Sequence, residues 1–96
     1  MSVFFLVEYK KITDEKTYRE YAEKVSNIIR SYGGEYVFKS ERLNPIPPGD
    51  WEIKRIVLIR FDNKEKIQEC FQSDEYKEIA HLRENSSISK VLIIEE

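Results

Sequence analysis

Three short apolar runs constrain the fold of this chain more than any other feature. Residues 3–7, 56–59 and 91–94 carry large apolar side chains at both odd and even positions. Successive side chains of a β-strand point to opposite faces of the sheet, so a strand of this kind is covered on both faces. The runs therefore predict three strands of one sheet that has two buried sides.

Two helical segments separate these strands. Residues 13–32 begin with a capping residue and acids, continue with apolar residues at three- and four-residue spacing, and end at Gly33-Gly34, which favours a helix C-terminus. Residues 62–82 begin with a capping-box pattern, and a second start signal at Ser73 predicts that this helix is broken there. A turn is expected at residues 85–87.

The segment between the two helices contains a second strand and a loop. Residues 35–43 form a less apolar strand, typical of a sheet edge, with Tyr36 and Phe38 expected on one side. Residues 44–50 contain three prolines, which cannot donate to a strand ladder, so they predict a loop that carries Trp51 at its exit.

The order of these elements predicts the architecture. The chain runs strand, helix, strand, strand (residues 53–61), helix, strand. This is the α+β, ferredoxin-like βαββαβ pattern, which forms an antiparallel sheet with its helices on one face. We expect one domain over residues 1–96. Helices on one face leave the other face bare, and a second copy of the chain packed sheet to sheet would cover it, so we expect a homodimer.

Composition excludes several classes of partner and site. The formal net charge is −2, and Lys10-Lys11 is the only adjacent basic pair, so we expect neither nucleic acid nor a membrane surface as a partner. The apolar runs are too short for a membrane span, and no export leader is recognisable. A single cysteine, Cys70, suits a reducing cytoplasm, and its spacing predicts a core position. The only histidine, His81, lies off the apolar stripe of its helix, and no metal site is predicted.

Chain direction gathers polar and aromatic residues at one end of the predicted sheet. This end holds the end of the first strand, the proline-rich loop and the end of the second helix, and a polar mouth on an apolar sheet is a candidate ligand site. Glu8 and Arg83 are the candidate catalytic residues. The candidate ligand-binding residues are Tyr9, Trp51, Lys54 and Tyr76.

Each candidate also has a structural explanation. Trp51 offers a flat face for stacking on a ligand, or it plugs the sheet end or the dimer contact. Arg83 binds a carboxylate, or it is a favourable charge at a helix C-terminus. Glu8 is a general base, or it is a solvated strand end paired with Lys54.

Several short segments in series resemble one protein family. They are Gly33-Gly34, Gly49-Asp50-Trp51, Arg55 before an apolar strand, Ser73-Asp74-Glu75-Tyr76, and Arg83 before the last apolar run. In this order and spacing the chain resembles the bacterial domain-of-unknown-function family 1330, of the dimeric α+β barrel superfamily. The resemblance implies a ferredoxin-like subunit whose sheet pairs with a partner's sheet to form a barrel, and relatives that include cofactor-free monooxygenases and isomerases. It implies no particular reaction.

Three hypotheses for function follow. The first is an enzyme, free of metal and nucleotide cofactors, that acts on a small aromatic or carboxylated metabolite in the barrel cavity. The second is a module that binds or senses such a ligand without chemistry. The third is a purely associative protein whose barrel is filled by its own side chains.

Overall fold

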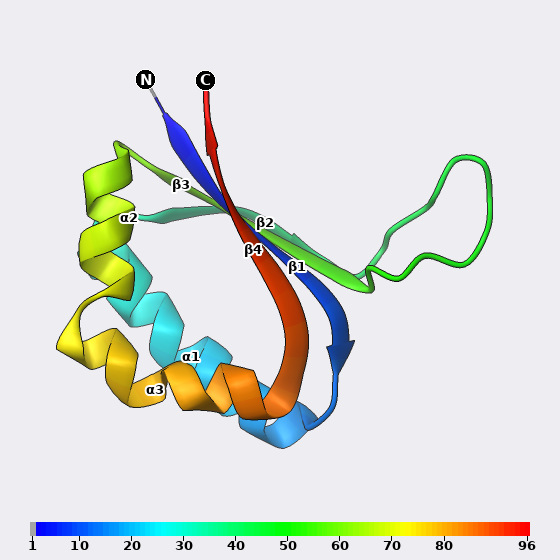
Figure 1. Ribbon diagram of the computed structural model, residues 1–96, viewed down its shortest axis with the longest axis horizontal. Coiled ribbons are helices and arrows are strands. Elements are labelled where there is room, and N and C mark those ends of the chain that lie inside the picture. The colour runs from blue at the N-terminus through cyan, green and yellow to red at the C-terminus, as the bar shows by residue number, and fades with distance from the viewer. Residues whose placement is uncertain (1) are drawn as a thin grey trace.

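The computed structural model describes residues 2–96 and shows a four-stranded sheet with helices on one face (Figure 1). The elements, in chain order, are β1 (Val3–Ile12), α1 (Glu15–Ser31), β2 (Glu35–Ser40), β3 (Arg55–Phe61), α2 (Lys64–Phe71), α3 (Asp74–Ser86) and β4 (Ser87–Glu95). The first and last strands are longer than their apolar runs, whereas β2 and β3 are shorter at the ends that flank the proline-rich loop.

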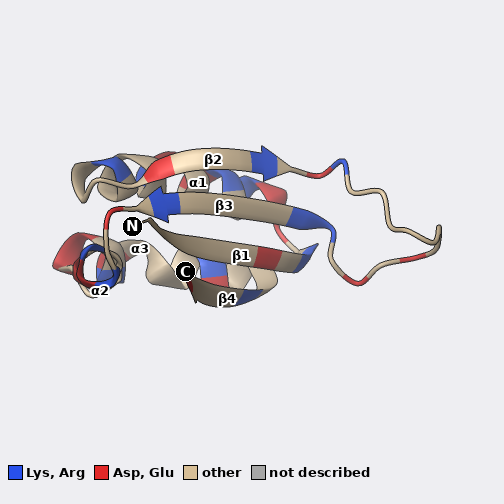
Figure 2. Cartoon of the chain, turned by 90° about the horizontal axis from the view of Figure 1, so that it is seen from above, with Lys and Arg blue, Asp and Glu red and all other residues tan. Residues whose placement is uncertain are grey.

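The sheet has the strand order of the predicted ferredoxin-like fold. Its order is β2-β3-β1-β4, and each neighbouring pair is antiparallel (Figure 2). The two helical crossovers therefore pass over the same face. The α+β architecture is confirmed, β2 is an edge strand as predicted, and β3 is central.

Helix α1 begins and ends with the signals found in the sequence. The Asp14 carboxylate accepts a hydrogen bond from the Thr17 amide at 3.1 Å and satisfies one of the free N–H groups at the N-terminus. At the other end Gly33 adopts φ +85°. The amides of Gly33 and Gly34 donate to the carbonyl oxygens of Arg30 and Ile29 at 3.0 and 2.9 Å, which is a Schellman motif.

Gly34 is also required by close packing. A Cβ atom there would lie 2.5 Å from Ile29 Cγ2 and 2.9 Å from Phe61 Cζ, and both side chains belong to the core. We expect Gly34→Ala to lower the free energy of unfolding by about 2 kcal/mol, because the core must shift to admit the methyl group. Urea unfolding measures this, with Gly49→Ala as the control, since nothing lies within 4 Å of a Cβ there. Equal stability of the two variants would contradict the packing argument.

The second helical segment is broken where the sequence predicts. Asn63 caps α2 and Ser73 caps α3, each side chain accepting a backbone N–H. The prediction of a turn at residues 85–87 is wrong. Ser86 ends α3 and β4 starts at the next residue, because the Ser86 and Ser87 hydroxyls donate to carbonyl oxygens of the last helical turn, and the Ser86 carbonyl accepts the Thr13 amide at 2.7 Å.

A β-bulge in β2 overturns the expectation that Tyr36 and Phe38 share a face. Tyr36 lies opposite Ile59, but the register shifts so that Phe38 lies opposite Leu58 and Lys39 opposite Val57. The extra residue reverses the alternation of side chains beyond it. Tyr36 and Lys39 therefore lie on the helix side of the sheet, and Phe38 lies on the other side.

The core lies between the sheet and the helices. Cys70 is fully buried in it, as predicted, and burial raises the pKa of its thiol to about 12. The remaining buried apolar side chains come from the helix side of β1 and β3 and from the inner faces of the helices. They are Phe5, Val7, Tyr9, Tyr18, Tyr21, Val25, Ile29, Val57, Ile59, Phe61, Ile67, Tyr76 and Ile79.

The opposite side of the sheet, which we call the outer face, carries a row of apolar side chains that no element of the chain covers. Leu6 lies opposite Leu58 and Leu92, and Leu58 lies opposite Phe38, so one apolar residue from each strand joins the row. Phe38 and Leu92 are about half exposed. Strand β4 is also exposed on its helix side, where Ile93 remains 40% exposed.

Candidate functional site

A small pocket lies between α1 and the helix side of the sheet. Its volume is about 30 Å³, which is room for one or two water molecules. Its walls are mostly aromatic and aliphatic, and its polar side chains are tyrosines, one lysine and one arginine. The lining residues are Phe5, Val7, Tyr9, Tyr18, Tyr21, Ala22, Val25, Ile29, Tyr36, Lys39, Arg55, Val57, Ile59 and Phe71.

Arg55 covers the mouth of this pocket. Strand β3 begins at Arg55, which has the same inward parity as Val57, and only 18% of its side chain is exposed. Its Nε donates to the Tyr18 hydroxyl at 3.1 Å, and its Nη1 donates to Glu41 Oε1 at 3.2 Å. A guanidinium held in this way presents fixed donors to a carboxylate, and Glu41, itself largely exposed, already occupies one side of them.

One further cation, Lys39, lines the pocket together with Arg55. Arg30 of α1 and Lys39 of β2 both sit over the Tyr36 ring, with charged centres 5.6 and 4.3 Å from the ring centroid. Partial desolvation lowers the pKa of Lys39, and the charges of Arg55 and Arg30 lower it further. Arg55 and Lys39 therefore place two positive groups in the wall of an apolar pocket, an arrangement that favours an anionic ligand.

Tyrosine hydroxyls form the deeper polar part of the site. The Tyr21 and Tyr76 hydroxyls lie 3.0 Å apart in the buried core, and the Tyr9 and Tyr18 rings meet edge to face at 5.1 Å. Burial raises the pKa of both Tyr9 and Tyr21, and neighbouring tyrosines raise it further. These phenols stay protonated at physiological pH and can therefore act as hydrogen-bond donors rather than bases.

The buried phenol of Tyr21 makes stability depend on alkaline pH. Because its pKa in the folded state lies above the unfolded value of 10.0, its contribution is complete below pH 10 and is lost as pH rises further. Above about pH 10 we expect the free energy of unfolding of Tyr21→Phe to fall less steeply with pH than that of the wild type. The two slopes should differ by about 1.4 kcal/mol per pH unit. Urea unfolding at a series of alkaline pH values measures this. Parallel pH profiles for the two proteins would show that Tyr21 is not the source.

The structure brings three of the six predicted site residues together on the helix side. Tyr9 lines the pocket, and the Tyr76 hydroxyl forms a hydrogen bond with the Tyr21 hydroxyl behind it. Arg83 is half-buried in α3, and its positive charge lowers the pKa of Tyr9, against the effect of burial. The other three lie elsewhere at the same end of the molecule. Glu8 is on the outer face, opposite Ile56 and Lys90.

Trp51 and Lys54 belong to the loop over residues 41–54. The Lys54 Nζ lies 2.9 Å from Asp50 Oδ1, so its partner is not Glu8. Trp51 is 51% exposed and does not line the pocket under α1. A single mouth formed by Glu8, Trp51, Lys54 and Arg83 is therefore absent from the described chain, since the sheet separates Glu8 from Arg83.

Sequence reasoning did not select Tyr18, Lys39 or Arg55 as site residues. Arg55 carried a usable signal, because it alternates with Val57 and Ile59 and therefore has the parity of the buried face. Tyr18 is a member of the apolar stripe of α1, and its hydroxyl gave no separate signal. Lys39 faces the pocket only because of the bulge in β2, which no residue pattern announces.

Two negative findings apply to residues 2–96. No helix in this range is long and apolar enough to span a bilayer. No cluster of three or more His, Cys, Asp or Glu side chains in this range is arranged to hold a metal ion.

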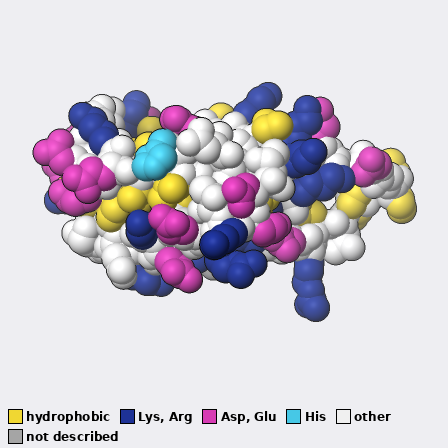
Figure 3. Space-filling model, turned by 90° about the horizontal axis from the view of Figure 1, so that it is seen from below, with side chains coloured by type: hydrophobic (Ala, Val, Ile, Leu, Met, Phe, Trp, Pro, Cys, Tyr) yellow, Lys and Arg dark blue, Asp and Glu magenta, His cyan; other side chains and the backbone are white. Residues whose placement is uncertain are grey.

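On the helix side of the molecule, acidic and basic side chains lie intermingled around His81 (Figure 3).

Comparison with family models decides the family. A model described as a domain of unknown function (DUF1330) matches residues 2–96. The chain belongs to this family. The resemblance found in the sequence is thereby confirmed over nearly the whole chain. No curated protein matches the chain.

Solved structures similar to this DUF1330 chain share its fold at low identity. A protein of unknown function from Rhodopseudomonas palustris gives a TM-score of 0.79 at 14% identity, over 99% of this chain and 82% of that one. SnoaB, a cofactor-independent oxygenase from Streptomyces nogalater, gives 0.72 at 8%, over 99% and 92%. A dimeric protein of unknown function with a ferredoxin-like fold from Bacteroides fragilis gives 0.66 at 12%, over 99% and 96%. The likeness shows the ferredoxin-like fold alone.

Proposed function

We propose that this protein binds a small aromatic carboxylic acid in the pocket under α1 and acts on it without a bound cofactor. The observation that carries the proposal is Arg55. Its guanidinium, largely buried, is held by Tyr18 at the mouth of an aromatic pocket, with Lys39 beside it. An aromatic ring suits the walls, and a carboxylate suits the cations at the mouth.

A small aromatic acid requires side chains to move, because the volume of the pocket is only about 30 Å³. The long, exposed side chain of Lys39 can swing outward without breaking any hydrogen bond of the sheet. The carboxylate of the ligand then takes the place of Glu41 against Arg55. Exchange of one carboxylate for another keeps the guanidinium paired throughout, which avoids the cost of a buried unpaired charge.

The reaction itself is less constrained than the binding. The lining residues include tyrosines, a lysine and an arginine but no carboxylate or histidine, so the pocket offers donors and cations rather than a strong base. This favours a reaction in which the ligand supplies its own reactivity and the protein positions it. One structure with the same fold is a cofactor-independent oxygenase. The composition of the pocket also supports the second candidate function, a binding module without chemistry.

The proposed functional unit is a homodimer joined through the outer face of the sheet. The apolar row from Phe38 to Leu92 needs a cover, and an identical row on a second copy supplies one. The dimeric relative with the same fold is consistent with this assembly. The pocket under α1 faces away from that interface, so each subunit holds its own site.

Benzoate and benzamide test the proposed ligand class. They share ring and size, and only benzoate carries the negative charge that Arg55 and Lys39 recognise. We expect benzoate at millimolar concentration to raise the melting temperature and benzamide to leave it unchanged. Equal shifts, or none for a panel of ring-substituted benzoates, would contradict the proposal.

Turnover separates the two candidate functions. Hydroxylated benzoates are incubated with the protein in air, without added metal or nucleotide, and analysed by mass spectrometry. A new product that depends on Arg55 supports an enzyme. Ligands that bind and are recovered unchanged support a binding module.

A further inference from the structure

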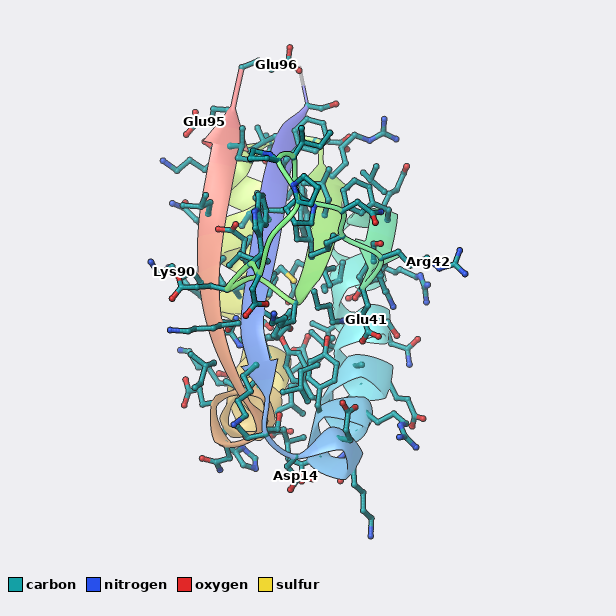
Figure 4. The ribbon with its side chains drawn as sticks, turned by 90° about the vertical axis from the view of Figure 1, so that its right-hand side faces the viewer. Asp14, Glu41, Arg42, Lys90, Glu95 and Glu96 are labelled. Carbon is teal, nitrogen blue, oxygen red and sulfur yellow. The ribbon has the colours of Figure 1, made fainter. Side chains whose placement is uncertain are left out.

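The loop over residues 41–54 stands away from the rest of the molecule. It leaves β2 on the side of the sheet opposite to the helices and curves back to β3 (Figure 1). Seen from the right-hand side, it lies in front of the outer face, with Glu41 labelled where it starts (Figure 4). The two views agree that the loop and the outer face lie on the same side of the sheet.

This loop exposes two large apolar side chains. Ile46 is 94% exposed and Trp51 is 51% exposed, and yellow side chains mark the far end of the loop (Figure 3). Three prolines accompany them within residues 44–50. Apolar side chains that a loop exposes to water add no stability to an isolated chain. The prolines restrict the free loop, so the loop loses less conformational entropy when it associates with a partner.

The base of the loop is fixed while its far end is free. The Lys54 amide donates to the Tyr9 carbonyl at 2.8 Å, and Lys10 Nζ lies 3.1 Å from Glu52 Oε1. Arg55 holds Glu41 at the other end of the loop. These contacts set the direction in which the loop projects, and none of them involves Ile46 or Trp51.

We infer that this loop is a clasp that packs Ile46 and Trp51 against the second copy of the chain. The inference rests on the proposed homodimer. A partner that covers the outer face approaches from the side on which the loop projects, and two-fold symmetry then brings each loop onto the other subunit. Two sheets packed face to face lie about 10 Å apart, close enough for a loop rooted at the sheet end to reach across. Trp51 is then an interface anchor rather than a ligand platform.

Trp51 is the only tryptophan, so its fluorescence reports on the clasp directly. Acrylamide quenching is compared between the wild-type protein at dimeric concentration and Leu58→Lys, which places a charge on the outer face and separates the subunits. We expect quenching of Trp51 to be about threefold stronger in the variant, because separation exposes the indole. Equal quenching in a wild-type protein that light scattering shows to be dimeric would overturn the clasp and leave the dimer intact. A monomeric wild type would overturn both.

A second variant tests the free end of the loop. We expect Ile46→Asp to weaken dimerisation about tenfold, because the carboxylate meets the partner's surface. His81→Asp is the matched control, since His81 is exposed on α3, across the sheet from the loop. An unchanged dimer affinity for Ile46→Asp would contradict the clasp. Circular dichroism verifies that both variants keep the fold, and benzoate present in the quenching assay shows whether a ligand rather than the partner covers Trp51.

Discussion

Arg55→Ala is expected to weaken benzoate binding about 100-fold, because removal of one partner of a desolvated charge pair costs about 3 kcal/mol or more. Arg55 supplies the guanidinium at the pocket mouth, and only 18% of its side chain is exposed. Lys39 remains but is exposed, and a single ammonium cannot form the paired hydrogen bonds of a guanidinium. Isothermal titration with benzoate measures the loss.

Arg60→Ala is the matched control for this variant. Arg60 lies on the same strand, but on the outer face at the opposite end, where it pairs with Glu35. Its removal should leave benzoate affinity within about twofold of the wild type, since an exposed ion pair contributes little. Equal losses in the two variants would show that net charge attracts benzoate, and that the pocket under α1 is not its site.

Leu58→Lys is expected to weaken the dimer at least 100-fold, because a buried unpaired charge costs about 3–5 kcal/mol. Leu58 is on a central strand and lies opposite both Leu6 and Phe38 in the apolar row of the outer face. In a separated subunit the lysine reaches water, so the fold itself survives. Light scattering at micromolar concentration distinguishes monomer from dimer.

Gln68→Lys is the control for Leu58→Lys. It adds the same charge on the exposed side of α2, across the sheet from the proposed interface. This variant should remain a dimer. Dissociation of both variants would mean that the interface includes the helices, whereas a dimer that tolerates Leu58→Lys would place it away from the outer face.

The sequence predicts the fold well because the relevant signals are local. Apolar residues at both parities identify the strands β1, β3 and β4, and capping residues identify the helix starts at Asp14, Asn63 and Ser73. The order of elements then allows few topologies. The missed boundary at Ser86 has the opposite cause, because the Ser86 carbonyl accepts a hydrogen bond from the amide of Thr13, which is distant in the chain.

The sequence predicts at which end of the sheet the site lies, but not on which face of the sheet. Chain direction correctly places Glu8, Tyr9 and the loop at the same end of the sheet, as the bond from the Lys54 amide to the Tyr9 carbonyl shows. Which face each side chain occupies depends on register, and a single bulge in β2 decides it for Lys39. The contact between Arg55 and Tyr18 joins residues far apart in the chain, so spacing alone could not reveal it.

Mapping of benzoate binding by amide chemical shifts in the isotope-labelled protein tests the central claim most directly. We predict shifts at Tyr9, Tyr18, Lys39 and Arg55, which belong to the pocket under α1, and none at Leu6 or Leu92 of the outer face. Shifts confined to the outer face would place the ligand on the other side of the sheet, between the two sheets of the proposed dimer. That result would contradict the site proposed for this protein.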